Sequence, residues 1–181
     1  MKTIVTEIPD YKTFFKGEKT VEIGYPWLTF GAIMAIEKIL RDSKGKFRIL
    51  EMGSGGSTIF FSQRCEYLLS LEHDPEWAIR VSRCLENPRN VECGAISRLK
   101  RIIRAEEDNF FDMILADSGA GATAYTRRLD MLKVALPKLK KGGWLILDNY
   151  EHMDFDYTGY DVYTFDMFHY SGRGTKLCRK L

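Results

Sequence analysis

The 181-residue sequence predicts an α/β fold, with a doubly wound, mainly parallel sheet followed by an antiparallel hairpin. Apolar runs typical of buried strands alternate with helical patterns through most of the chain, and this order requires crossover connections that place helices on both faces of the sheet. A glycine-rich segment at residues 53–57 joins the first strand to its helix. Beyond residue 149 two short strand-like runs flank a turn, and these predict the hairpin.

The individual elements follow from periodicity and from turn residues. Ile33, Ile36 and Leu40 recur at helical spacing, and Thr29 stands before them as the expected N-cap. The predicted strands are Arg48–Met52, Tyr67–Glu72 and residues 90–93, 111–117 and 143–148. The predicted helices between them are Ile96–Ala105 and residues 57–65, 75–86 and 125–139. Tyr160–Phe165 and Thr175–Lys180 are expected to form the hairpin around a turn at residues 171–174.

The glycine-rich segment and an acid on the next strand indicate a nucleotide-like cofactor. Glycines after a buried strand let a ligand approach the backbone N–H groups at the start of the following helix. Glu72 ends the second predicted strand nineteen positions after Gly53, the separation at which a carboxylate accepts hydrogen bonds from ribose hydroxyls. A dinucleotide fingerprint needs a third glycine where Thr58 stands, and this weakens the alternative of NAD binding.

Size and charge limit the remaining possibilities. The length and a hydrophobic content of 45% predict one domain over residues 1–181, in which residues 1–30 form an extension that packs over the cofactor side. The 27 basic and 25 acidic residues are interspersed, so no footprint for nucleic acid stands out. The four cysteines lack the spacing of a zinc site. Without a signal-peptide pattern or a membrane-length apolar run, we expect a cytoplasmic protein with no membrane partner.

Two segments resemble the cofactor motifs of class I S-adenosylmethionine-dependent methyltransferases. Residues 49–58, ILEMGSGGST, resemble the first motif, in which an acid precedes a G-x-G loop, and residues 68–77, LLSLEHDPEW, resemble the second. The resemblance covers residues 27–181 and implies a Rossmann-like methyltransferase fold with S-adenosylmethionine as cofactor. It implies that Gly53, Ser54 and Gly55 line the methionine portion, with Glu51 near the amino group and Glu72 on the ribose. The cofactor residues implied in this way are Glu51, Gly53, Ser54, Gly55, Ser57, Glu72, His73, Ala95 and Asp117.

Oxygen-bearing side chains follow the fourth and fifth predicted strands. Asp117 follows one, and Asp148 and Asn149 end the other, so three hard ligands of the kind that Mg²⁺ favours share one rim of the sheet. This arrangement resembles that of catechol-type O-methyltransferases, and it implies that Asp117, Asp148 and Asn149 are catalytic and hold a divalent cation that lowers the pKa of a substrate hydroxyl. In the alternative, Asp148 and Asn149 cap a loop and Asp117 contacts the cofactor amine.

A group of small methyltransferases offers a further resemblance. They share a P-W-L-T start, an E-H-D-P-x-W second motif and a G-G-x-x-x-x-D-N fifth strand, which match residues 26–29, 72–77 and 142–149. The resemblance to this group does not indicate a substrate. The loop after the fourth strand lacks the N-P-P-Y pattern of amino-directed DNA methyltransferases, which argues against a base-flipping enzyme.

Several other side chains have two interpretations each. His152 is either a base near the mouth of the site or a solvated loop residue. Arg127 and Arg128 either clamp an anionic substrate or cap and solvate the next helix. Trp27 and Trp77 either frame the ligands or pack in the core.

We therefore expect methyl transfer from S-adenosylmethionine to a small-molecule acceptor, at an oxygen, with assistance by Mg²⁺ left open. The chemistry requires the protein to hold donor and acceptor in line. The alternatives are a catalytically silent or regulatory cofactor-binding module and an NAD-dependent oxidoreductase. The sequence does not fix the oligomeric state, and a homo-oligomer is compatible with it.

Overall fold

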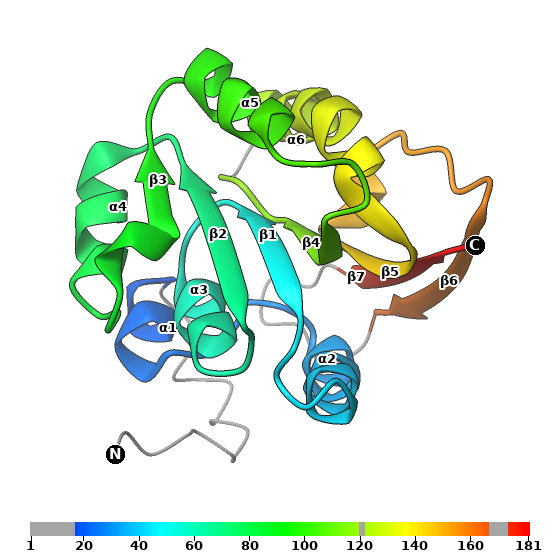
Figure 1. Ribbon diagram of the computed structural model, residues 1–181, viewed down its shortest axis with the longest axis horizontal. Helices are drawn as coiled ribbons and strands as arrows, with labels where there is room; N and C mark the ends of the chain where they lie inside the picture. The colour runs from blue at the N-terminus through cyan, green and yellow to red at the C-terminus, as the bar shows by residue number, and fades with distance from the viewer. Residues whose placement is uncertain (1–16, 120–121, 167–173) are drawn as a thin grey trace.

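The computed structural model describes residues 17–119, 122–166 and 174–181. Its centre is a seven-stranded sheet in the order β3-β2-β1-β4-β5-β7-β6 (Figure 1). Strands β1 to β5 are parallel, and β7 runs antiparallel to both of its neighbours, β5 and β6. The predicted parallel sheet and C-terminal antiparallel hairpin are both confirmed. Residues 171–173 of the predicted turn, and residues 1–16 of the predicted extension, lie outside the described residues.

The strands and helices keep the predicted order. The strands are β1 Arg48–Met52, β2 Tyr67–Glu72, β3 Val91–Cys93, β4 Phe111–Ala116, β5 Leu139–Asp148, β6 Tyr160–Phe165 and β7 Thr175–Lys180. The α-helices are α1 Gly17–Ile23, α2 Phe30–Asp42, α3 Gly56–Ser62, α4 Pro75–Ser82, α5 Ile96–Ala105 and α6 Ala122–Ala135. None of the described helices is both long and apolar enough to span a membrane.

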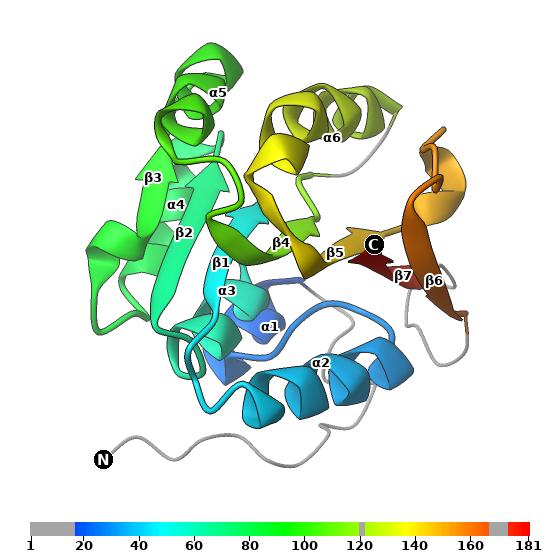
Figure 2. The same ribbon diagram turned by 45° about the vertical axis from the view of Figure 1, so that its right-hand side comes forward.

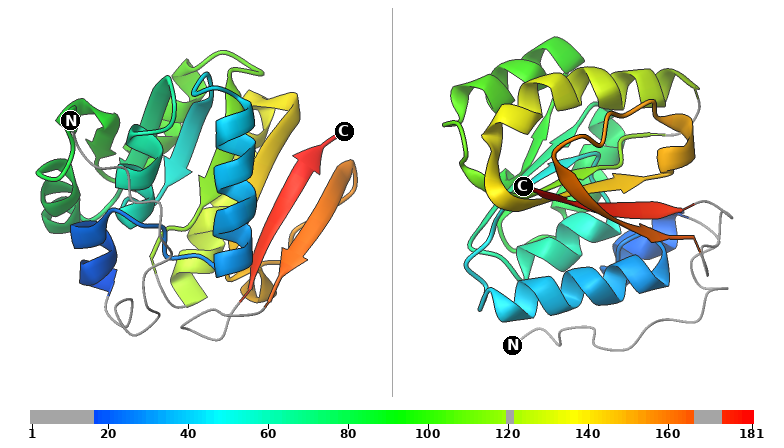
Figure 3. Two further views of the ribbon diagram at one scale, coloured as in Figure 1. Left: turned by 90° about the horizontal axis from the view of Figure 1, so that it is seen from below. Right: turned by 90° about the vertical axis from the view of Figure 1, so that its right-hand side faces the viewer.

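The helices cover the two faces of the sheet separately (Figure 2). Alternate residues of each central strand serve the two faces: Leu50 packs in the cluster under α5 and α6, whereas Ile49 packs with α2 and α3. Figure 3 shows α2 across the second face, close to β7. Both faces of the central strands are therefore buried, which explains why those strands read as continuous apolar runs.

Some element boundaries differ from the predictions. Strand β5 begins at Leu139 rather than residue 143, because residues 140–143 form an irregular stretch within its pairing with β4. The predicted helices 57–65 and 75–86 end early, at Ser62 and Ser82. The predicted helix 125–139 instead starts at Ala122 and becomes a 3₁₀ turn at Leu136–Lys138, because Pro137 has no N–H for the helical ladder.

The start of the chain's described part also differs in detail. Helix α1 was not predicted, because seven residues give too short a pattern to detect. Thr29 is the N-cap of α2 as predicted, but its side chain makes no capping hydrogen bond. Its backbone N–H instead donates to Thr175 Oγ1 at 3.1 Å, which links α2 to β7.

Candidate functional site

A cavity of about 330 Å³ opens at the carboxyl ends of the parallel strands. Its volume lies at the small end of the range typical of small-molecule sites. The predicted site residues that line it are Gly53, Ser54, Gly55, Ser57, Glu72, His73, Asp117, Asp148 and Asn149. Trp27, Trp77 and Gly56 of the predicted glycine-rich segment also line it, together with three residues for which the sequence predicted no role: Thr20, Asp74 and Gly119. The cavity therefore joins the glycine loop to the ends of β2, β4 and β5.

Glycine is required in the loop for two different spatial reasons. Gly53 has φ +98°, and a Cβ there would lie 2.2 Å from the carbonyl oxygen of Asp117. A Cβ on Gly56 would lie 2.4 Å from the carbonyl oxygen of Thr20 and 2.1 Å from that of Tyr25. A Cβ on Gly55, in contrast, would meet no atom within 4 Å. Gly53 and Gly56 allow the close packing of this loop, and Gly55 leaves open space at the cavity.

Glu51 lies beneath the loop and not among the cavity-lining residues. Its side chain is fully buried, and its Oε2 accepts hydrogen bonds from the hydroxyls of Thr58 and Ser70, each at 2.6 Å. Burial raises the pKa of Glu51 to about 7, while these hydroxyls and that of Ser57 oppose the shift. Thr58 Oγ1 also accepts from the N–H of Gly55 at 2.8 Å, so the residue at the third fingerprint position connects the loop to the buried acid.

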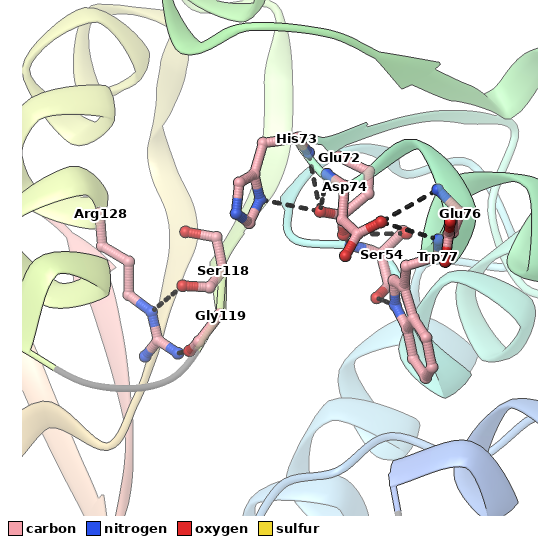
Figure 4. Close-up of polar contacts among 9 residues, drawn as sticks. All are labelled: Ser54, Glu72, His73, Asp74, Glu76, Trp77, Ser118, Gly119 and Arg128. Carbon is pink, nitrogen blue, oxygen red and sulfur yellow. Dashed lines mark hydrogen bonds and ion pairs between the residues drawn. The ribbon is translucent and has the colours of Figure 1, made fainter.

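Glu72 at the end of β2 is held by neutral donors (Figure 4). Its Oε2 accepts from the N–H of Ser54 at 2.9 Å and from the Ser54 hydroxyl at 3.2 Å. Its Oε1 accepts from the N–H groups of His73 at 2.7 Å and Asp74 at 3.0 Å, and His73 Nδ1 lies 2.9 Å away. These bonds orient the carboxylate toward the glycine loop.

The turn after Glu72 fixes a tryptophan against the same loop. Asp74 Oδ1 accepts from the N–H groups of Glu76 and Trp77, which caps α4. The indole Nε1 of Trp77 then donates to the carbonyl oxygen of Ser54 at 2.6 Å. Ala95, one of the cofactor residues that the resemblance implied, is the N-cap residue of α5 and does not line this cavity.

The ends of β4 and β5 are joined by a buried arginine of α6. The side chain of Arg128 is 0% exposed, and its Nη2 donates to Asp117 Oδ1 at 2.9 Å. It also donates to three carbonyl oxygens: Nε to Ser118 at 3.2 Å, Nη1 to Asp148 at 2.7 Å and Nη2 to Gly119 at 2.8 Å. Four hydrogen bonds thus tie the loop after β4 to the end of β5.

Of the two aspartates at these ends, Asp148 is buried and Asp117 is partly buried at the wall of the cavity. Burial raises the pKa of Asp117 to about 6, although the charge of Arg128 opposes this shift. Burial, and next the charge of Asp117, raise the pKa of Asp148 well above its usual range. Asp148 Oδ1 accepts from the hydroxyl of Thr175 at 2.8 Å. Asn149 follows in the left-handed region with φ +52°.

The sequence predicted the strand-end acids but not the role of Arg128. Both interpretations offered for this residue, a substrate clamp and a solvated helix-capping side chain, differ from the buried ion pair that the structure contains. One signal was available: Ala124, Arg128, Met131 and Ala135 recur at helical spacing and are all buried. His152, the other candidate, is exposed and stacks on Tyr125 with ring centroids 4.6 Å apart.

The described residues offer few side chains that are arranged to bind a metal ion. Within residues 17–119, 122–166 and 174–181, no group of three or more His, Cys, Asp or Glu side chains is arranged to hold a metal ion. Asp117, Asp148 and Asn149 do line one cavity, but one oxygen of each aspartate already has a protein partner.

Comparison with known proteins identifies the fold. No family model matches the sequence, and no curated protein matches it. Among solved structures, the O-methyltransferase from Bacillus cereus in complex with SAH matches with a TM-score of 0.67 and 16% identity over 97% of this chain and 94% of that one. A methyltransferase from Geobacter sulfurreducens matches with a TM-score of 0.60 and 14% identity over 98% of this chain and 93% of that one. An rRNA methylase from Streptococcus thermophilus matches with a TM-score of 0.60 and 14% identity over 82% of this chain and 96% of that one.

These matches show that the chain has the class I methyltransferase fold, as the motif resemblance implied. The match to an O-methyltransferase extends over nearly the whole chain. Sequence identities of this size support the fold alone. The acceptor has to be argued from the residues around the cavity.

Proposed function

We propose that this protein transfers a methyl group from S-adenosylmethionine to an oxygen of a small molecule. The observation that supports this most is the single cavity that brings the glycine loop, Glu72 and the acids of β4 and β5 together. In doubly wound sheets, ligands bind outside the carboxyl ends of the strands, which is where this cavity opens. The B. cereus O-methyltransferase of the same fold was solved with SAH, which makes this cofactor the first to test.

The residues present fit this cofactor. S-adenosylmethionine supplies an activated methyl group on a sulfonium, and transfer leaves S-adenosylhomocysteine. Gly55 lines the cavity, and a Cβ there would meet no protein atom within 4 Å, which leaves room for a ligand beside the loop. Glu72, which is held by neutral donors and keeps its charge, gives the wall a carboxylate that favours a cationic ligand. Glu72 is the group that would accept hydrogen bonds from ribose hydroxyls.

The lining of the cavity argues against an anionic acceptor. None of the described residues that line it is lysine or arginine, whereas a nucleic-acid site needs cations against the phosphates. Thr20 and Trp27 bound the cavity from the segment before β1, and Asn149 bounds it from the end of β5. A small acceptor would be held between these segments and the methyl donor.

Calorimetry with S-adenosylmethionine, SAH and NAD tests the cofactor assignment. We expect binding of the first two and none of NAD. The variants Gly55→Ala and Gly55→Val are the sharpest probes, because the backbone at Gly55 has φ 176° and accepts any residue, while the added side chain occupies open space at a residue that lines the cavity. SAH affinity should fall progressively, by roughly tenfold or more for valine, with the melting temperature unchanged.

An acceptor panel then tests the reaction. Methylation of hydroxylated small molecules, detected by SAH release and by mass of the product, would support the proposal. Binding of NAD instead of SAH would reject it in favour of an oxidoreductase. SAH binding without turnover on any acceptor would favour the silent or regulatory module.

A further inference from the structure

We propose that the guanidinium of Arg128 supplies the positive charge at the β4–β5 edge, so that methyl transfer in this protein needs no divalent cation. The inference rests on the proposed methyl transfer and concerns the same rim of the cavity. It departs from the Mg²⁺ site that the resemblance to catechol-type enzymes implied for Asp117, Asp148 and Asn149.

A cation is already built into this edge. Arg128 is fully buried and bonds at once to Asp117 Oδ1 and to the carbonyl oxygen of Asp148, the two residues expected to hold the metal. Arginine stays protonated in proteins, so its charge cannot be removed to make way for a second cation. The guanidinium therefore lies between the strand ends as a permanent counter-charge to the acids.

The oxygen ligands expected from Asp117, Asp148 and Asn149 do not fit a divalent cation while Arg128 is bonded to this edge. Asp117 Oδ1 is engaged by Arg128 at 2.9 Å, and Asp148 Oδ1 is engaged by the Thr175 hydroxyl at 2.8 Å. Mg²⁺ demands close oxygen ligands in near-octahedral geometry. It would have to enter beside a buried guanidinium that repels it in a poorly screened environment. Asn149, the third expected ligand, is neutral and adds no compensating charge.

The same contacts make Arg128 a positioning residue. Its bonds to the carbonyl oxygens of Ser118 and Gly119 hold the loop after β4, and its bond to that of Asp148 holds the end of β5. Gly119 and Asp148 both line the cavity, whereas Arg128 itself is not among the lining residues. Arg128 thus acts on the site through the groups it holds.

Metal binding to the unmodified protein is the first test. Mn²⁺ is titrated into the protein, with and without SAH, and free Mn²⁺ is measured by electron paramagnetic resonance. We expect no binding at this edge and full turnover after dialysis against EDTA. Mn²⁺ binding that disappears in Asp117→Asn would overturn the proposal. Loss of turnover on chelation that added Mg²⁺ restores would overturn it equally.

Removal of the guanidinium is the second test. Arg128→Met leaves the two acids without their cation, so the variant should gain Mn²⁺ affinity by roughly tenfold or more over the unmodified protein. The control Lys133→Met removes an exposed charge from the same helix and should gain none. A folded Arg128→Met protein with no gain in Mn²⁺ affinity would overturn the proposal, and if that variant does not fold, the first test decides alone.

A charge-conserving variant separates charge from position. Arg128→Lys keeps one positive charge but cannot reach all four acceptors, so Mn²⁺ should stay excluded while kcat falls by roughly tenfold. Tight Mn²⁺ binding by this variant would contradict the assignment of charge to the side chain at 128. Calorimetry with SAH on the same preparations keeps the two proposals distinct, since failure to bind SAH rejects the methyl-transfer function, whereas the Mn²⁺ results bear only on Arg128.

Discussion

The two halves of the cavity hold their carboxylates by different chemistry. At the β1–β2 half, Glu72 is oriented by backbone N–H groups and the Ser54 hydroxyl, and His73 Nδ1 lies 2.9 Å from it. At the β4–β5 half, Asp117 meets a buried guanidinium. Neutral donors orient an acid without neutralising it, whereas a buried cation cancels its charge. The first half is therefore suited to recognise a polar ligand, and the second to hold two strand ends in place.

The largest expected effect comes from removing the guanidinium of Arg128 from the β4–β5 half, the charged half of the cavity. Arg128→Met leaves the partly buried Asp117 without its cation and removes the buried donor from three carbonyl oxygens. We expect the free energy of unfolding to fall by about 3–5 kcal/mol. Urea denaturation measures it, with Lys133→Met as a control that should change it by less than about 0.5 kcal/mol. Equal losses in the two variants would show that the buried ion pair is not what stabilises this half.

A second prediction concerns Glu51, the acid beneath the β1–β2 half, which is the neutral half of the cavity. The pKa of Glu51 is about 7 in the folded protein, above the ordinary value of 4.5 that applies when unfolded, so the native state binds the extra proton between these pH values. Stability contributed by this group is thus present at low pH and is lost as pH rises through this window. Glu51→Gln should be more stable than the unmodified protein at pH 8, by roughly 3 kcal/mol.

The pH dependence of melting checks this sign. Thermal unfolding of both proteins between pH 4.5 and 8 should give curves that meet at the acid end and diverge toward the alkaline end. Parallel curves would mean that Glu51 is ionised in the folded protein throughout. The result would show whether burial, against the opposing effect of the hydroxyl donors, keeps this acid protonated near neutrality.

A third prediction separates packing from ligand space within the glycine loop. Gly56→Ala places a Cβ against the carbonyl oxygens of Thr20 and Tyr25 and should destabilise the fold by about 1–3 kcal/mol. Gly55→Ala should leave the free energy of unfolding unchanged, because open space lies around it. Denaturation and SAH titration on both variants measure the contrast. If Gly56→Ala is as stable as the unmodified protein, α1 and the segment after it lie farther from the loop than the structure has them.

The comparison of the two halves also explains what the sequence could predict. The strands β1, β2 and β4 were recognisable because burial on both faces leaves continuous apolar runs. Strand topology then placed Glu72, Asp117 and Asp148 at one edge without any knowledge of side-chain contacts. The start of β5 was missed because Lys140, Lys141 and two glycines resemble a turn, although they continue a strand with an irregular register.

The charged half was less predictable than the neutral half for a physical reason. A glycine loop and an acid at fixed spacing are local signals, whereas the partner of Asp117 arrives from a helix eleven residues later. An arginine is solvated by default, so its place in an apolar helical stripe was the single sign of burial. Glu51 shows the converse case, in which a residue matched a cofactor motif and yet lies beneath the loop, bonded to Thr58 and Ser70.

The smallest expected effect tests how tightly the neutral half is braced. Trp77→Phe keeps most of the ring but removes the indole donor to the Ser54 carbonyl oxygen, a bond of 2.6 Å that is partly buried. We expect a loss of about 1 kcal/mol in the free energy of unfolding and a fewfold loss in SAH affinity. Tyr67→Phe is the control, because it deletes an exposed hydrogen bond to Glu106 at the opposite end of β2 and should change the affinity by nothing measurable. If both variants bind SAH equally well, the loop keeps its shape without Trp77, and the orientation of Ser54 rests on Glu72 alone.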